Sequence, residues 1–311
     1  MLDVMLRYRC RPVAVQFDLA KAYNTLRTGP QERHLRRFVW RMSPSEPWQD
    51  YALDRVHFGD ACAATQLEVG KDLVAEAGVD IDPEASQRIE DDLYVDDGLT
   101  GGDEEQVARF VGTKLEDGSY DGKFSKILAL GNFKIKAYGV AGQKSTEESD
   151  LMRNKVLGYN YNLEEDMMSL TFPINLSRKR RSVRQEPDIT LKDVDQLRSR
   201  TLTKRVLLGV TNGFRDFLGM ASPYTVKYKA LMRKLFLLEK PLTWDEPVPD
   251  ESRLEWVDLI IETLQSCPLF FPRSTRSASA LPRVGPTVVG FSDHGSCLWG
   301  ESVLEMATPG N

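Results

Sequence analysis

Short apolar runs bounded by turn-forming residues predict strands in several parts of the chain. Residues 11–18 form a β-type run that ends in an acid, Asp18. The acid-rich segment 89–100 contains embedded apolar residues and is followed by glycines, which predicts a hairpin whose turn carries Asp96 and Asp97. Further strands are predicted over residues 133–136, 156–159 and 287–293.

Longer segments with apolar residues at helical spacing predict helices. The segment 203–240 has this pattern, with breaks at Gly219 and at Ser222-Pro223. We expect two helices, over about 65–77 and 103–115, to back the sheet that carries Asp18. Shorter helical patterns occupy residues 33–41 and 254–264, whereas 268–286 is rich in Pro, Ser and Arg and is interpreted as a linker. This mixture predicts the α+β class.

The composition narrows the class of protein. The 311 residues are 41% hydrophobic and 28% charged, which excludes collagen-like, coiled-coil and wholly disordered chains. No apolar run reaches the length of a membrane span, and the first residues lack the features of a signal peptide. The four cysteines and three histidines are scattered, so we expect reduced thiols and no zinc site. We therefore expect an intracellular protein, cytoplasmic or nuclear, with no membrane partner.

The net charge of −5 hides a basic block. Residues 171–240 carry 16 basic and 6 acidic side chains, while the flanking parts of the chain are acidic. A basic block of this kind is typical of a module that binds a polyanion, although a solvated helix face gives the same pattern. The charge distribution therefore suggests nucleic acid as a binding partner.

The adjacent acids Asp96 and Asp97 are the sharpest local feature. Two carboxylates on a tight turn repel each other unless a cation lies between them, and Mg²⁺ prefers carboxylate oxygens. Asp18, at the end of a neighbouring strand, is placed to supply a third carboxylate. The alternative is a solvated turn, since Asp favours turns. A calcium loop starting at Asp92 fails, because Asp97 would occupy the position of the required glycine.

Several strings taken together resemble one family. FDLAKAY over 17–23 and YVDD over 94–97 are similar to motifs A and C of reverse transcriptases. The narrower resemblance is to the polymerase of Bel/Pao-type LTR retrotransposons, and the remaining matches follow in the expected order. They are LRRFVWR over 35–41, VHFG over 56–59, KVLGY over 155–159, TKR over 203–205, FLGMASP over 217–223 and WDEPVP over 244–249.

The resemblance implies an RNA-directed DNA polymerase that uses two Mg²⁺ ions, a deoxynucleoside triphosphate and an RNA or DNA template-primer duplex. Its implied metal ligands and catalytic residues are Asp18, Asp96 and Asp97, with the backbone of Leu19 as a further ligand. The implied nucleotide-binding residues are Tyr23, Phe58, Gly59 and Lys136, and the implied primer grip is Leu157 and Gly158. Contacts to nucleic acid are expected from Arg178, Lys179, Arg180, Arg181, Lys204 and Arg205.

The same resemblance implies a division of the chain. We expect a polymerase palm over 1–165 with the fingers largely absent, a basic linker over 166–200 and a helical thumb- or connection-like region over 201–267. A linker over 268–286 then leads to the first strands of a truncated ribonuclease H-like domain over 287–311, with Asp293 as a vestigial acid. We expect an incomplete copy with weak or no activity. The alternatives are a non-catalytic nucleic-acid-binding remnant and an unstable transposon fragment.

Overall fold

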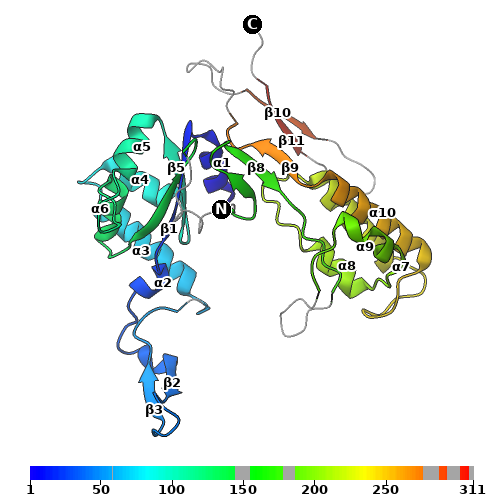
Figure 1. Ribbon diagram of the computed structural model, residues 1–311, viewed down its shortest axis with the longest axis horizontal. Helices are drawn as coiled ribbons and strands as arrows, with labels where there is room; N and C mark the ends of the chain where they lie inside the picture. Colours follow the sequence, from blue (N-terminus) through cyan, green and yellow to red (C-terminus); the bar gives the residue numbers. More distant parts are fainter. Residues whose placement is uncertain (58, 144–154, 178–185, 276–286, 293–301, 308–311) are drawn as a thin grey trace. The chain divides into compact units, whose positions relative to one another are not determined.

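The computed structural model describes residues 1–57, 59–143, 155–177, 186–275, 287–292 and 302–307. It divides into two compact units, each with its own core (Figure 1). Unit 1 comprises residues 1–152, 163–165 and 273–311, and unit 2 comprises 153–162 and 166–272. Small antiparallel sheets with helices make up both units, so the α+β class is confirmed.

A four-stranded antiparallel sheet forms the centre of unit 1, in the order β4-β5-β1-β6. Its strands are β1 (Val13–Leu19), β4 (Leu93–Tyr94), β5 (Asp97–Gly102) and β6 (Ile135–Val140). The predicted hairpin is confirmed, because β4 pairs with β5 through Tyr94 and Asp97. The segment 89–92, however, belongs to a helix and not to the first strand.

Helices α3, α4, α5 and α6 pack against one another on one face of this sheet (Figure 1). They span Ala63–Ala77, Pro83–Asp92, Glu104–Val111 and Lys123–Ala129, so the two expected backing helices are present. Asp82 caps α4 by accepting a hydrogen bond from the Ala85 amide, and Asp103 and Gln106 form a capping box that starts α5. The buried rings of Phe17, Phe110 and Phe124 join the sheet to the helices.

A buried carboxylate ties the N-terminal helix α1 (Leu2–Cys10) to the start of the hairpin. Asp92 is fully buried, and it accepts hydrogen bonds from Arg7 at 2.9 Å and from the Thr100 hydroxyl at 2.8 Å. Arg11 and Arg88 place two further guanidinium groups within 3.6 and 3.8 Å of the same carboxylate. Burial raises the pKa of Asp92, while Thr100, Arg7 and Arg11 oppose that rise.

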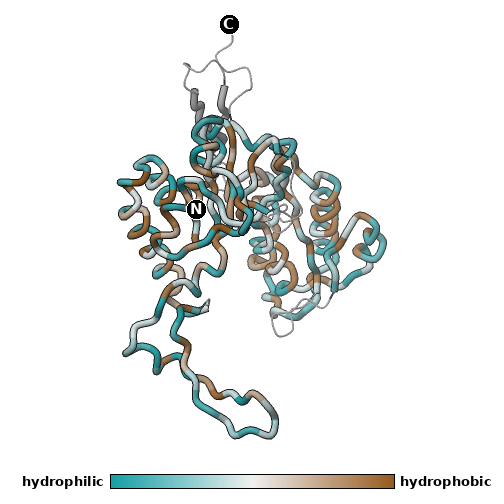
Figure 2. Tube along the Cα trace, turned by 60° about the vertical axis from the view of Figure 1, so that its left-hand side comes forward, coloured by the Kyte–Doolittle hydropathy of each residue, from teal (hydrophilic) through white to brown (hydrophobic). Residues whose placement is uncertain are grey.

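Residues 26–56 of unit 1 form an arm that extends from the sheet (Figure 2). The helical prediction over 33–41 is wrong: a 3₁₀ turn (Arg33–Arg36) leads into β2 (Arg37–Trp40), which pairs with β3 (Gln49–Ala52). Although the apolar residues have helical spacing, contacts between the two strands stabilise a hairpin here. Phe38 stacks on Tyr51 with ring centroids 5.5 Å apart. Large apolar side chains on the arm stay exposed, among them Leu35 (75%), Met42 (75%) and Trp48 (60%).

Unit 2 combines a three-stranded sheet with a helical group. The sheet contains β7 (Asn160–Asn162), β8 (Met167–Leu170) and β9 (Leu269–Pro272) in that order. The helices are α7 (Val194–Ser199), α8 (Lys204–Thr211), α9 (Ser222–Phe236) and α10 (Asp250–Ser266). The expected break between α8 and α9 is confirmed, whereas β8 and β9 lie in segments that we interpreted as linkers.

The last described strands, β10 (Thr287–Ser292) and β11 (Ser302–Ala307), pair antiparallel, so the predicted strand over 287–293 is present. In the described part of the chain no helix has the length and apolar character needed to cross a membrane. Cys10, Cys62 and Cys267 are free thiols.

Candidate active site

The hairpin register brings three carboxylates to one end of the central sheet. Asp18 on β1 lies directly opposite Asp97 on β5, so both side chains leave the sheet on the same face with Cβ atoms about 4.5–5.5 Å apart. Asp96 lies in the two-residue turn between β4 and β5, and its carbonyl accepts a 3.0 Å hydrogen bond from the Leu19 amide. Two adjacent strands therefore hold Asp18, Asp96 and Asp97 close together.

The turn that carries Asp96 is strained. Val95 has a φ of +58°, a conformation that is unfavourable for a β-branched residue and costs about 1–3 kcal/mol. Lys71, which is 1% exposed on α3, donates a 3.2 Å hydrogen bond to the Leu93 carbonyl at the start of this hairpin. Together with the Asp92 cluster one residue earlier, this contact anchors the strained turn to the core.

Gly98 leaves space for an aromatic ring next to the carboxylates. It lies opposite Phe17 in the β1–β5 register, and a Cβ at Gly98 would come within 2.4 Å of the Phe17 ring. Phe17 is fully buried and is held by Phe124 and Tyr138, so the ring has no space to move away. Because Gly98 has no side chain, the aromatic core can pack directly next to the carboxylates.

Negative charge accumulates where the carboxylates meet. Burial, followed by repulsion from Asp96 and Asp18, raises the pKa of Asp97 to about 6. Burial and Asp96 also raise the pKa of Asp18, which Lys136 partly offsets. Among the described residues, no group of three or more His, Cys, Asp or Glu side chains is arranged as a preformed metal site. A cation would therefore have to draw these carboxylates together.

Lys136 reaches the site because of a β-bulge. On β6, Tyr138 lies opposite Phe17 and Ile135 lies opposite Leu19, so the two residues between them face the single residue Asp18. Such a bulge redirects a side chain. The Lys136 Nζ consequently lies 3.9 Å from Asp18 Oδ2, with 41% of the lysine side chain exposed.

Tyr23 and Leu19 lie beside the carboxylates. Tyr23 is half-buried on the short helix α2 (Ala22–Thr25), and burial, with Asp96 and Tyr94 as the next contributions, raises the pKa of its hydroxyl. Leu19 buries its side chain in the core. Its backbone continues directly from Asp18 and contacts the turn through the hydrogen bond to Asp96.

Gly59 lies on an exposed turn of unit 1 with a φ of +102°. No heavy atom lies within 4 Å of the position of a Cβ there, so the backbone conformation and not a close contact requires glycine. Phe58 lies outside the described residues.

Leu157 and Gly158 form a tight turn in unit 2, not the predicted strand over 156–159. Val156 and Tyr159 exchange two backbone hydrogen bonds across them, and both turn residues have positive φ. The Tyr159 hydroxyl donates to Asp216 at 2.7 Å and accepts from the Leu218 amide at 2.7 Å. The turn is thereby fixed to the segment that precedes α9.

Lys204 and Arg205 have partners within unit 2. The ammonium group of Lys204 donates to the Leu242 carbonyl and lies 4.1 Å from the Phe236 ring centroid, and the residue is 7% exposed. Arg205 forms two hydrogen bonds with the Asp245 carboxylate, at 2.9 and 3.1 Å. A phosphate would have to compete with these contacts. The other expected cations, Arg178, Lys179, Arg180 and Arg181, lie outside the described residues, as does Asp293.

Sequence reasoning missed the supporting residues of this site. Asp92 was considered only as the start of a calcium loop, which fails, and nothing in the local sequence marks it as buried. The bulge opposite Asp18 leaves no signal in the β6 sequence. Gly98 directly follows Asp97 and was interpreted only as the boundary of a hairpin.

Comparison with known protein families gives one finding for this chain. Residues 203–303 match the family described as a Pao retrotransposon-like RNaseH-like domain. This match supports a Pao retrotransposon polyprotein fragment. It indicates an RNaseH-like domain across residues that we divided into a thumb- or connection-like region, a linker over 268–286 and the start of a ribonuclease H-like domain. Comparison with curated proteins finds no match.

Proposed function

We propose that this Pao-type polyprotein fragment carries the catalytic centre of an RNA-directed DNA polymerase, at the end of the central sheet of unit 1. The observation that carries the proposal is the convergence of Asp18, Asp96 and Asp97 through the β1–β5 register and the β4–β5 turn. A solvated turn would need only the two adjacent acids. The third carboxylate comes from a strand more than 70 residues away in the sequence and adds repulsion that a simple turn would avoid.

The donor set fits divalent cations of the Mg²⁺ type. The three side chains offer only carboxylate oxygens, which hard cations prefer. Burial, followed by repulsion among the carboxylates, raises the pKa values of Asp18 and Asp97, and a bound cation would oppose that repulsion. We propose Asp18, Asp96, Asp97 and the Leu19 carbonyl as ligands. Two bound Mg²⁺ ions would supply charge stabilisation to the attacking and leaving oxygens of phosphoryl transfer.

The neighbouring residues have roles that follow from their positions. The flat ring of Tyr23, next to the carboxylates, would restrict the space on the sugar of a bound deoxynucleotide. Lys136 would place a positive charge beside the phosphates while it also orients Asp18. Phe58 and Gly59 would line the nucleotide pocket, and the turn at Leu157 and Gly158 would support the primer. The template-primer duplex would be bound mainly through its phosphates, so its affinity should fall with salt.

Primer extension on an RNA template tests this proposal. The full chain is incubated with Mg²⁺ and the four deoxynucleoside triphosphates, beside Asp96→Asn and the matched control Asp80→Asn, which removes an exposed carboxylate on the loop before α4. We expect weak extension by the wild type and the control, and a further loss of at least 100-fold in Asp96→Asn, since an electrostatic stabiliser of this kind contributes about 10²–10³ in rate. Equal extension by all three proteins, or none by folded wild type, would contradict it.

A further inference from the structure

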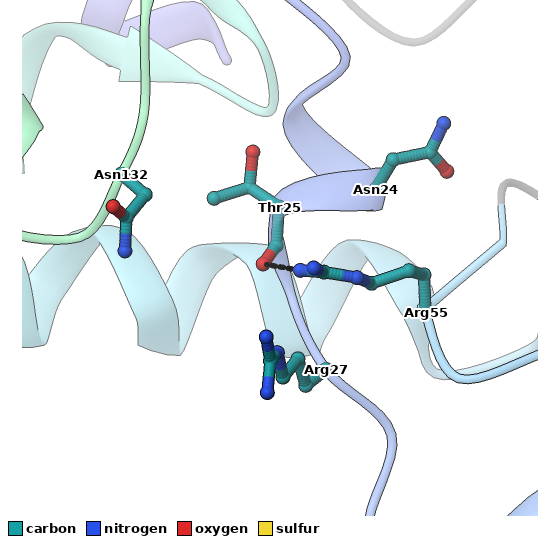
Figure 3. Close-up of a pocket in the computed structure, with 5 residues that line it drawn as sticks. All are labelled: Asn24, Thr25, Arg27, Arg55 and Asn132. Atoms are coloured by element: carbon teal, nitrogen blue, oxygen red, sulfur yellow. Dashed lines mark hydrogen bonds between the residues drawn. The ribbon is translucent and has the colours of Figure 1, made fainter.

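A cavity of about 610 Å³ opens in unit 1, and the described residues that line it are Asn24, Thr25, Arg27, Arg55 and Asn132 (Figure 3). Every one of these side chains can donate a hydrogen bond, and two of them carry a positive charge. Among the described lining residues there is no carboxylate and no large apolar side chain. The lining therefore matches an oxygen-rich anion and not an apolar ligand.

The fold places the two arginines together. Arg27 and Arg55 are partners in an antiparallel bridge at the base of the arm, and hydrogen bonds from the Thr28 amide to Asp54 and from the Val56 amide to Leu26 continue the pairing on both sides. Figure 3 shows both guanidinium-bearing side chains beside the Thr25 carbonyl. Like charges directly opposite each other are destabilising; Asp54 gives Arg55 a counter-charge, with 3.9 Å between Arg55 Nε and Asp54 Oδ1, and an anion in the cavity would offset the charge of Arg27 as well.

The two arginines differ in how they are held. Arg55 donates a 3.0 Å hydrogen bond to the Thr25 carbonyl, which fixes its guanidinium at the cavity wall. Arg27 is exposed, and it makes no ion pair or side-chain hydrogen bond with any residue that the structure describes. One guanidinium is thus preorganised and the other is free to close on a ligand. Two forked donors of this type suit the geometry of a phosphate group.

The residues that line the cavity are close in sequence to residues of the candidate active site. Asn24 and Thr25 follow Tyr23 on α2, and Arg55 precedes Gly59 by four residues. Asn132, whose left-handed φ of +59° is one that Asn tolerates, precedes Lys136 by four residues in the turn into β6. A ligand in the cavity would therefore lie beside the residues proposed to hold the nucleotide.

We propose that Arg27 and Arg55, with Asn24, Thr25 and Asn132, form a phosphate-binding site. The phosphate comes either from a nucleotide triphosphate or from the backbone of a nucleic-acid strand. The assignment of these two sources rests on the proposed polymerase function, while the phosphate chemistry rests on the cavity itself.

Binding of three probes to the full chain tests the site: tripolyphosphate, a deoxynucleoside triphosphate and a fluorescent single-stranded 12-mer, each measured in EDTA over a series of salt concentrations. The variant is Arg27→Gln, and the matched control is Arg37→Gln, which removes an exposed arginine from β2 of the same arm. We expect Arg27→Gln to weaken binding of tripolyphosphate and of at least one other probe about tenfold and Arg37→Gln to leave it unchanged.

The probes separate the two sources. A loss for the triphosphate assigns the nucleotide, and a loss for the 12-mer, with the slope of log K against log salt falling by about 1, assigns the strand backbone. Equal binding by both variants and the wild type overturns the site. Asp97→Asn, measured in parallel, keeps the two proposals distinguishable: it should abolish primer extension while leaving phosphate binding in EDTA intact.

Discussion

Replacing the exposed Asp97 with Asn should stabilise unit 1 at neutral pH. In the folded chain the pKa of Asp97 is raised from 3.8 to about 6, first by burial and then by repulsion from Asp96 and Asp18. A raised pKa means that the folded state binds the proton more tightly than the unfolded state does. Its stability is therefore complete below pH 4 and declines as the pH rises towards 6.

The size of the effect follows from the same pKa. A rise from 3.8 to about 6 corresponds to about 3 kcal/mol against the ionised form. Asp97 is an exposed residue, so screening by solvent reduces this ceiling to about 1 kcal/mol. For a unit of this size, that free energy corresponds to a rise in Tm of about 2–4 °C.

This shift in Tm is measured by thermal unfolding in EDTA, followed by circular dichroism at pH 4 and pH 8. Asp97→Asn should melt above the wild type at pH 8 and with it at pH 4, and Asp80→Asn should match the wild type at both. Millimolar Mg²⁺ should raise the Tm of the wild type more than that of Asp97→Asn, because cation binding offsets the repulsion. If Asp97→Asn melts below the wild type at pH 8, repulsion among the carboxylates is not what limits stability here, and the reasoning is refuted.

Three further substitutions probe the support of the site. Asp92→Asn leaves Arg7, Arg11 and Arg88 beside a neutral group, so urea unfolding should show that the free energy of unfolding falls by about 3 kcal/mol. The matched change Asp91→Asn should lower it by less than about 0.5 kcal/mol. Equal losses in the two variants would contradict a buried charge cluster. Gly98→Ala forces a Cβ against the Phe17 ring and should cost about 1–3 kcal/mol in the same assay, and an unchanged midpoint would show that the ring can move. Lys136→Met removes the one cation that lowers the pKa of Asp18, so titration of the Asp18 carboxyl by NMR should give a higher pKa; an unchanged value would place Lys136 away from the site in solution.

The sequence predicted the parts of the fold that depend on local signals. Three features are of this kind: the YVDD turn between two apolar runs, the glycine and proline breaks in the segment 203–240, and the strand that ends at Asp18. In each, the local residues favour one structure. The structure places Asp18 opposite Asp97, which required only that the two strands pair in the register that buries Phe17.

The remaining features depend on contacts that no local pattern encodes. Residues 33–41 have helical spacing, yet pairing across the arm makes most of them a turn and a strand. The bulge opposite Asp18 arises from three-dimensional pairing, and so does the bridge that joins Arg27 to Arg55. Strand β9 lies in a segment that we interpreted as a linker from its Pro, Ser and Arg content, and its pairing partner, β8, lies about 100 residues earlier in the chain.

The most direct test of the carboxylate site is the binding of Mn²⁺, as a spectroscopic substitute for Mg²⁺, measured by electron paramagnetic resonance on the wild type, Asp97→Asn and Asp80→Asn. If Asp18, Asp96 and Asp97 form a divalent-cation site, the wild type and Asp80→Asn bind Mn²⁺ equally and Asp97→Asn binds it at least tenfold more weakly. The same Mn²⁺ affinity in all three proteins would contradict the site, and with it the proposed polymerase centre.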